Sequence, residues 1–101
     1  MDKKINLGPI EKVPLGQGFC FIVNEEEIAV FRPRSGGIYA THNRCPHRKA
    51  PLCEGLVGER QVVCPYHGHK FDSQTGAGSE NGETVAVYEV EEKDGEIFLK
   101  I

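Results

Sequence analysis

Short apolar runs separated by polar turns dominate the first half of the chain. The segments 19–23 (FCFIV) and 27–31 (EIAVF) are rich in β-branched and aromatic residues, and only the polar residues 24–26 lie between them. The segment 32–37 (RPRSGG) supplies a second turn before the apolar residues 38–40. Proline interrupts a strand and glycine tolerates turn conformations, so the pattern predicts a three-stranded antiparallel meander.

A second hairpin is predicted at the other end of the chain. The segments 84–90 (TVAVYEV) and 96–101 (EIFLKI) flank 91–95, whose Asp94-Gly95 pair is a strong turn signal. No stretch keeps a helical period over three turns, and Gly and Pro together supply 18 of the 101 residues (12 and 6). We therefore expect an all-β fold with short strands and very little helix.

The middle of the chain, from about 42 to 72, differs in kind. It holds all four His, three of the four Cys and three of the six Pro, with little apolar patterning. We interpret it as a loop-built lobe inserted into the β scaffold. A chain of 101 residues has the size of one small domain, so a single domain is expected over 1–101.

Charge is distributed unevenly between this middle segment and the remainder. The net charge is −3, yet segment 42–72 is +2 and the remainder is therefore −5. Its charged residues are Arg44, Arg48, Lys49, Arg60 and Lys70 against Glu54, Glu59 and Asp72. This balance argues against nucleic-acid binding and leaves two interpretations, a solvated surface or a basic collar that steers an acidic redox partner. No apolar run has the length of a signal peptide or a membrane span, so we expect a cytoplasmic protein without membrane contact.

Two short boxes carry the candidate chemistry. The first is Cys45-Pro46-His47, and the second, after sixteen intervening residues, is Cys64-Pro65-Tyr66-His67. Each box offers one thiolate and one imidazole. In a reducing compartment, metal ligation is a better explanation of such cysteines than disulfides. A Rieske [2Fe–2S] cluster uses this mixture, since two His replace two Cys on one of its irons.

Zinc is the main alternative for the same four side chains, because two Cys and two His form a common tetrahedral site. Classical zinc fingers, however, place Cys with Cys and His with His around a helix, whereas each box here mixes the two. A redox disulfide between Cys45 and Cys64 would leave two well-spaced histidines without a purpose. A zinc-stabilised interaction module therefore remains the alternative from a different functional class.

The segment 43–72 (NRCPHRKAPLCEGLVGERQVVCPYHGHKFD) resembles Rieske ferredoxins and the Rieske-type small subunits of NAD(P)H-dependent nitrite reductases. The resemblance implies a Rieske-type antiparallel β-sandwich with an inserted, loop-rich cluster-binding lobe and one [2Fe–2S] cluster. It also implies that Cys45 and Cys64 bind the inner iron, while His47 and His67 bind the outer iron near the surface, where electrons enter and leave.

The same resemblance implies an electron carrier that catalyses nothing on its own. The segment 27–33 (EIAVFRP) resembles the nitrite reductase small subunit more than a dioxygenase ferredoxin, so the former is the first expectation. The alternative is a free ferredoxin that feeds a ring-hydroxylating dioxygenase. The expected partners are then a flavin reductase, a nitrite reductase large subunit or a terminal oxygenase.

Several positions depart from the respiratory, high-potential branch of the family. In that branch each box has an extra Cys that joins a disulfide, and these positions hold Ala50 and Tyr66 here. A Ser and a Tyr hydroxyl also donate hydrogen bonds to sulfur in that branch, at the positions of His69 and Phe71. Losing these donors disfavours the reduced form, so we expect a midpoint potential at the low end of the Rieske range, about −150 mV.

Four further Cys and His residues lie outside the two-box spacing. We expect Cys20 to be a small buried core residue and Cys53 to be a loop residue near the cluster without a ligand role. His42 and His69 flank the boxes and are not expected to be ligands. For His69 we expect either a solvated loop position or a place on the docking surface.

Overall fold

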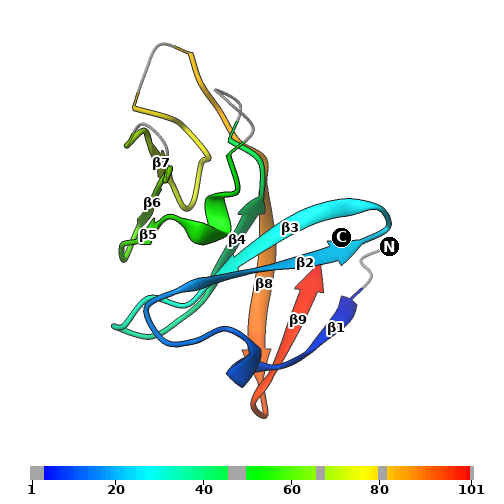
Figure 1. The fold of residues 1–101 in the computed structure, drawn as a ribbon. Coiled ribbons are helices and arrows are strands. Elements are labelled where there is room, and N and C mark those ends of the chain that lie inside the picture. The colour runs from blue at the N-terminus through cyan, green and yellow to red at the C-terminus, as the bar shows by residue number, and fades with distance from the viewer. Residues whose placement is uncertain (1–3, 46–49, 66–67, 80–81, 101) are drawn as a thin grey trace.

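The computed structural model describes residues 4–45, 50–65, 68–79 and 82–100 of the protein. Within these ranges it is built from nine strands and two single 3-10 turns, η1 and η2 (Figure 1), which confirms the predicted all-β class. The strands are β1 (Lys4–Pro9), β2 (Gly18–Val23), β3 (Glu26–Phe31), β4 (Tyr39–His42), β5 (Leu56–Val57), β6 (Gln61–Val63), β7 (Lys70–Asp72), β8 (Val87–Lys93) and β9 (Glu96–Lys100). The turns are η1 (Ile10–Lys12) and η2 (Leu52–Glu54). No helix in the described ranges is long and apolar enough to cross a membrane.

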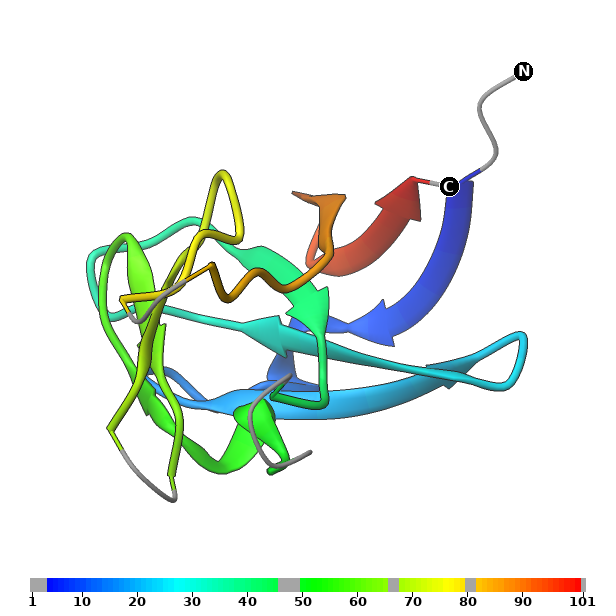
Figure 2. The same ribbon diagram turned by 90° about the horizontal axis from the view of Figure 1, so that it is seen from above.

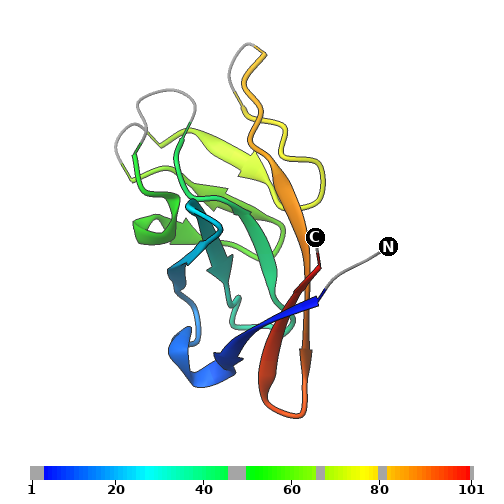
Figure 3. The ribbon, with the colours of Figure 1, turned by 90° about the vertical axis from the view of Figure 1, so that its right-hand side faces the viewer.

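Six strands form one antiparallel sheet in the order β1-β9-β8-β4-β3-β2. A short ladder joins β4 to β8, in which Ala40 pairs with Tyr88 and Thr41 with Val87, and the amide of His42 donates to the carbonyl of Ala86 just before β8. The sheet folds over at this junction, so β1-β9-β8 and β4-β3-β2 form the two layers of a sandwich (Figure 3). The meander β2-β3-β4 and the hairpin β8-β9 are the two units that the hydrophobic pattern predicts.

Both hairpins turn through two residues with positive φ. Asp94 (φ 54°) and Gly95 (φ 77°) connect β8 to β9, as their sequence predicts. Asn24 (φ 50°) and Glu25 (φ 69°) connect β2 to β3 in the same way. Two positive φ angles give a turn whose twist matches that of the flanking strands.

The strand β1 is absent from the sequence-based prediction. Its residues pair with β9, but the register shifts between Asn6 and Gly8, where Gly8 has a φ of 107°. An irregular edge strand of this kind lacks the regular alternation of apolar and polar residues by which a strand is recognised.

A first hydrophobic core fills the space between the two layers of the sandwich. Strands from both layers contribute to it, together with residues of and after η1. Its buried members are Leu7, Ile10, Val13, Ile28, Val30, Ala40, Ile97 and Leu99.

The strand β3 is buried on both faces. Its residues Ile28 and Val30 belong to the core of the sandwich, while the alternating residues Ala29 and Phe31 belong to a second core on the opposite face. All four side chains are at most 1 % exposed. A second layer must therefore cover the outer face of β3, and the inserted lobe provides it.

The inserted lobe lies at one end of the sandwich, away from β1 and β9 (Figure 2). Its loops were predicted, but its three-stranded antiparallel sheet β5-β6-β7 was not. These strands are only two or three residues long, too short for alternation to be visible in the sequence. Val62 and Phe71 pair across β6 and β7 and are fully buried against the outer face of β3.

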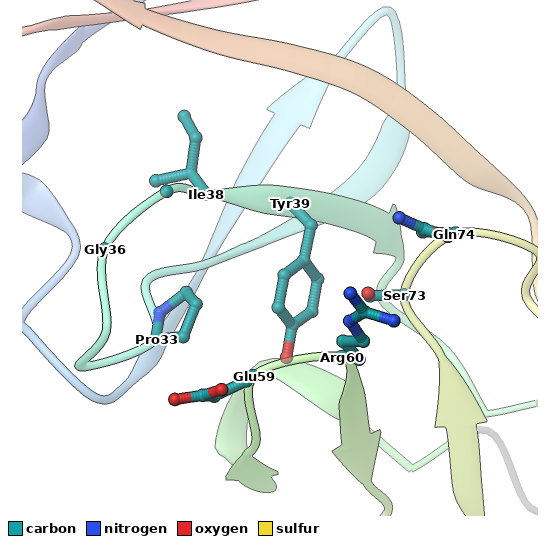
Figure 4. Close-up of a pocket in the computed structure, with 9 residues that line it drawn as sticks. Pro33, Gly36, Ile38, Tyr39, Glu59, Arg60, Ser73 and Gln74 are labelled. Atoms are coloured by element: carbon teal, nitrogen blue, oxygen red, sulfur yellow. The ribbon is translucent and has the colours of Figure 1, made fainter.

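Tyr39 links the lobe to the sandwich. Figure 4 shows its ring pointing from β4 toward the turn between β5 and β6, and the ring packs on Phe31 with 5.2 Å between ring centroids. Its hydroxyl lies 2.8 Å from the carbonyl oxygen of Gly58 and 2.9 Å from that of Gln61, so it can donate to either. Burial raises the pKa of Tyr39 well above its usual range, which keeps the hydroxyl a donor.

The double burial of β3 gives a first prediction. We expect Phe31→Ala to lower the free energy of unfolding by about 3 to 5 kcal/mol, because it leaves a cavity between β3 and the lobe. Urea-induced unfolding followed by circular dichroism measures this change. Ile22→Ala on the neighbouring strand is the matched control, since Ile22 is 68 % exposed and its truncation should change stability by at most about 0.5 kcal/mol. Equal effects of the two substitutions would contradict the assignment.

Candidate metal centre

Cys45 lies just beyond the end of β4, at the start of the first box. Its amide donates a 2.9 Å hydrogen bond to the carbonyl of Ala50, and Arg44 forms an isolated antiparallel bridge with Pro51. The described residues on the two sides of 46–49 therefore lie close together. The Cys45 side chain is fully buried.

Cys64 follows β6 at the start of the second box. Its amide donates a 2.7 Å hydrogen bond to the carbonyl of His69, and its own carbonyl accepts the amide of Gly68 at 3.2 Å. Gly68 has a φ of 71°, a conformation that glycine adopts at little cost. These bonds close the connection between β6 and β7, and the Cys64 side chain is 2 % exposed.

Both cysteines belong to the second hydrophobic core, beside Ala50, Leu52 and Val62. No disulfide joins them to each other or to another described cysteine. Cys64 also borders a surface pocket of about 370 Å³ whose other lining residues include Leu56 and Gly68. Two buried thiols from separate loops, one beside an open pocket, fit a metal group bound through thiolates.

The structure brings together two of the four predicted ligands. His47, His67 and the neighbouring Tyr66 lie outside the described residues. Among the residues that are described, no group of three or more His, Cys, Asp or Glu side chains is placed to hold a metal ion. The assignment of all four side chains as ligands therefore stays a prediction.

The first box is anchored to β3 by an ion pair. Glu27 on β3 accepts hydrogen bonds from Nε and Nη2 of Arg44 at 2.9 and 2.8 Å, so the guanidinium binds the carboxylate through both oxygens. The Arg44 guanidinium, followed by the Asn43 amide, holds the pKa of Glu27 below its ordinary value. The charge of Arg44 is thus largely neutralised, which leaves less for the basic collar that the sequence suggested.

Asn43, which the sequence analysis did not single out, completes this anchor. Its side chain is 1 % exposed; Nδ2 donates to Glu27 Oε1 at 3.1 Å and Oδ1 accepts the amide of Cys53 at 3.0 Å. Its backbone makes two further hydrogen bonds. The amide of Asn43 donates to the carbonyl of Glu27 at 2.9 Å, and the carbonyl of Asn43 accepts the amide of Leu52 at 2.6 Å. In the sequence, only its position two residues before the candidate ligand Cys45 could have indicated a role for Asn43. A buried polar side chain with all these bonds fixes the loop on which Cys45 lies.

A second polar contact holds the other box. His69 Nδ1 lies 2.9 and 3.0 Å from the two carboxylate oxygens of Glu83, and these side chains are only 16 % and 14 % exposed. His69 is thus paired and mostly buried rather than a solvated loop residue, and a place on the docking surface stays a prediction. The contact ties the segment before β8 to the residue whose carbonyl accepts the Cys64 amide.

The other departures from the high-potential pattern lie in apolar surroundings. Ala50 is 1 % exposed and Phe71 is fully buried, both in the core that contains Cys45 and Cys64. These two positions therefore present carbon atoms where the high-potential branch has a thiol and a hydroxyl.

The remaining cysteines and His42 take well-defined positions. Cys20 is half-buried on β2 rather than a core residue, which corrects the expectation for it. Cys53 is half-buried on η2, and burial raises its pKa to about 11. His42 on β4 accepts the amide of Arg44 through Nδ1 at 3.1 Å.

Comparison with protein-family models gives a match to the Rieske [2Fe-2S] domain over residues 3–91. The chain therefore belongs to the Rieske [2Fe–2S] domain family. Its cofactor is a Rieske-type [2Fe–2S] cluster and its general role is electron transfer. This outcome favours the cluster over the structural zinc that the ligand set alone left open.

Similar proteins include free ferredoxins and much longer oxygenases. The chain is 36 % identical over 72 residues to the ferredoxin component of the naphthalene 1,2-dioxygenase/salicylate 5-hydroxylase systems of Ralstonia sp., covering 71 % of this chain and 68 % of that protein. It is 49 % identical over 47 residues to a 4beta-methylsterol monooxygenase of Methylococcus capsulatus, covering 46 % of this chain but 13 % of that enzyme. The chain thus spans a small part of the oxygenase and about two thirds of the ferredoxin.

Solved structures show the same fold over nearly the whole chain. The ferredoxin of carbazole 1,9a-dioxygenase from Nocardioides aromaticivorans has a TM-score of 0.82 at 27 % identity, covering 96 % of each chain. The Escherichia coli protein NirD has a TM-score of 0.88 at 26 % identity, covering 100 % of this chain and 98 % of the other. A protein described as an NADH-dependent nitrite reductase small subunit from Mycobacterium tuberculosis reaches 0.89 at 21 % identity, covering 100 % and 96 %. The Rieske-type fold is confirmed.

The Glu27–Arg44 pair gives a prediction about pH. Because the folded-state pKa of Glu27 is lowered, its ionised form stabilises the fold above the unfolded-state pKa, and this contribution is lost as the pH falls through the folded-state value. We expect Glu27→Gln to be less stable than the wild type near pH 7, and the difference to shrink as the pH falls below about 4.5.

Unfolding in urea at a series of pH values measures this difference. Glu26→Gln is the matched control, an exposed neighbour on the same strand for which we expect little effect at any pH. A gap between wild type and Glu27→Gln that stays constant down to low pH would contradict the ion-pair interpretation.

Proposed function

We propose that the protein carries single electrons through a cluster bound by Cys45, Cys64, His47 and His67, in one domain over 1–101. The supporting observation is the burial of Cys45 and Cys64 in a single core, in a chain whose family match covers both boxes. Bound there, the cluster would accept and release one electron at a time. Each box would supply one thiolate and one imidazole to hold the cluster.

The chain's own residues would set the surroundings of this cluster. Apolar side chains such as Leu52, Val62 and Phe71 exclude water from the cysteine side. The contact of Glu27 with Asn43 anchors the first loop to β3, and the contact of Glu83 with His69 anchors the second loop to the segment before β8. Rigid loops keep the geometry of the site nearly the same in both oxidation states, so electron transfer requires little energy of rearrangement.

For the acceptor, we infer a terminal oxygenase as the first candidate. The supporting observation is the 36 % identity to a ferredoxin component over about two thirds of both chains. Ferredoxin CarAc of Metapseudomonas resinovorans supports the same assignment, at 37 % identity with 76 % of this chain and 73 % of that protein covered. The donor would then be a flavin reductase.

The small subunit of an NAD(P)H nitrite reductase is the second candidate. It is supported by the TM-scores of 0.88 and 0.89 over the full length of this chain, and by the local resemblance of the segment 27–33. Structural likeness at 21 to 26 % identity is the weaker support for a shared partner. We therefore rank it second, although the segment 27–33 alone made it the first expectation.

Mixing the reduced protein with purified candidate acceptors tests the assignment. A ring-hydroxylating oxygenase should reoxidise the protein rapidly, as seen by recovery of the visible absorption, while a nitrite reductase catalytic subunit should do so slowly. The reverse order of rates would favour the second candidate.

The ligand assignment predicts distinct results for the two kinds of side chain. Cys45→Ser and Cys64→Ser should abolish the visible absorption at about 450 nm and the electron paramagnetic resonance signal of the reduced state. His47→Cys or His67→Cys should lower the midpoint potential or lose the cluster, since a thiolate adds negative charge to the site. His42→Ala is the control and should keep both signals. A colourless wild-type protein with one zinc per chain would reject the assignment altogether.

The apolar positions Ala50 and Phe71 predict a low midpoint potential, about −150 mV. Without a hydroxyl donor near sulfur, the extra electron of the reduced form is less stabilised. Phe71→Tyr should raise the midpoint, while Phe71→Leu should leave it nearly unchanged. A redox titration checks all three proteins, and a wild-type midpoint above zero would contradict the interpretation.

A further inference from the structure

The proposed cluster does not use two of the four cysteines, Cys20 on β2 and Cys53 on η2. The turn η2 packs on β2, and the carbonyl oxygen of Cys53 lies 3.0 Å from the point that a Cβ on Gly18 would occupy. Cys20 lies two residues further along the same strand, so its side chain leaves the same face of β2 as that point. The two cysteines therefore lie on the two sides of the β2–η2 contact.

A chain of hydrogen bonds through Glu27 and Asn43 connects the two residues. The thiol of Cys20 contacts Glu27 Oε1 at 3.9 Å, and the same oxygen accepts Asn43 Nδ2 at 3.1 Å. Asn43 Oδ1 in turn accepts the amide of Cys53 at 3.0 Å. Neither thiol belongs to a disulfide, both residues are half-buried, and each cysteine influences the pKa of the other. Their proximity thus follows from a chain of bonds that runs through one buried asparagine.

We propose that Cys20 and Cys53 form a disulfide site that is separate from the cluster ligands and closes under oxidising conditions. The oxidant is a small-molecule disulfide such as oxidised glutathione. One cysteine sulfur forms a mixed disulfide and releases one reduced glutathione; the other then displaces the second glutathione. The two thiols lose two electrons and two protons, and the oxidised glutathione gains both.

The environment of the pair separates it chemically from metal-binding cysteines. Burial raises the pKa of both thiols, and the carboxylate of Glu27 raises the pKa of Cys20 further. Metal ions bind thiolates, so protonated thiols compete poorly for iron while the cluster is assembled. The same protonation makes closure slow, as suits a bond formed only under sustained oxidation.

A closed disulfide would brace the first box. It would join the edge strand β2 to η2, which follows Ala50 and Pro51 directly in the chain. A disulfide that closes a long loop lowers the conformational entropy of the unfolded chain more than that of the folded chain, and so stabilises the fold. We therefore expect the closed form to release its iron to a chelator more slowly, by about tenfold or more.

Trypsin digestion gives a direct test, because the four cysteines fall in four different peptides. Cleavage after Lys and Arg, but not before Pro33, yields peptides 13–34 with Cys20, 45–48 with Cys45, 50–60 with Cys53 and 61–70 with Cys64. The holoprotein is treated with oxidised glutathione, free thiols are alkylated, and the digest is analysed without reduction by mass spectrometry.

The expected product is peptide 13–34 linked to 50–60, formed while the visible absorption of the cluster persists. Cys20→Ser and Cys53→Ser should each abolish this product and leave the other cysteine as a glutathione adduct. A link between 45–48 and 61–70 in its place, or full alkylation of Cys20 and Cys53 after oxidation, would overturn the proposal. Iron release at equal rates from the open and closed forms would overturn the bracing role.

Discussion

The burial of β3 on both faces is the constraint on which the rest of the structure depends. Ile28 and Val30 close the core of the sandwich, and the alternating Ala29 and Phe31 require a second cover. The lobe supplies that cover with Val62 and Phe71. A strand with one exposed face would need no such insertion, so the packing of β3 explains why the lobe and the sandwich form one structure.

The same strand also sets the position of the candidate ligands. Glu27, near the start of β3, pairs with Arg44 and Asn43 immediately before Cys45, and Asn43 extends the contact to Cys53. Cys45 therefore sits on a loop whose backbone is bonded to the best-buried strand of the molecule. A rigid ligand loop suits an electron carrier. Because the geometry of the site then changes little on reduction, little energy is spent on rearrangement when an electron arrives.

The four cysteines divide into two environments that predict different chemistry. Cys45 and Cys64 are buried members of an apolar core, whereas Cys20 and Cys53 are only half-buried, and burial raises the pKa of both of these thiols. Sequence spacing separated the two groups, since only Cys45 and Cys64 have a histidine two or three positions on. The contact between Cys20 and Cys53 could not be read from spacing, because it depends on how η2 packs on β2.

The sequence by itself determined the all-β class, the meander β2-β3-β4, the hairpin β8-β9 and the two boxes. Each rests on local chemistry: β-branched runs, the Asp94-Gly95 turn and the mixing of Cys with His over a few residues. Only the tertiary structure decided the strand β1, the small sheet of the lobe, and the partners of Asn43 and His69. These features arise from contacts between residues far apart in the chain, such as His69 with Glu83, and short or irregular segments carry no periodic signal of such contacts.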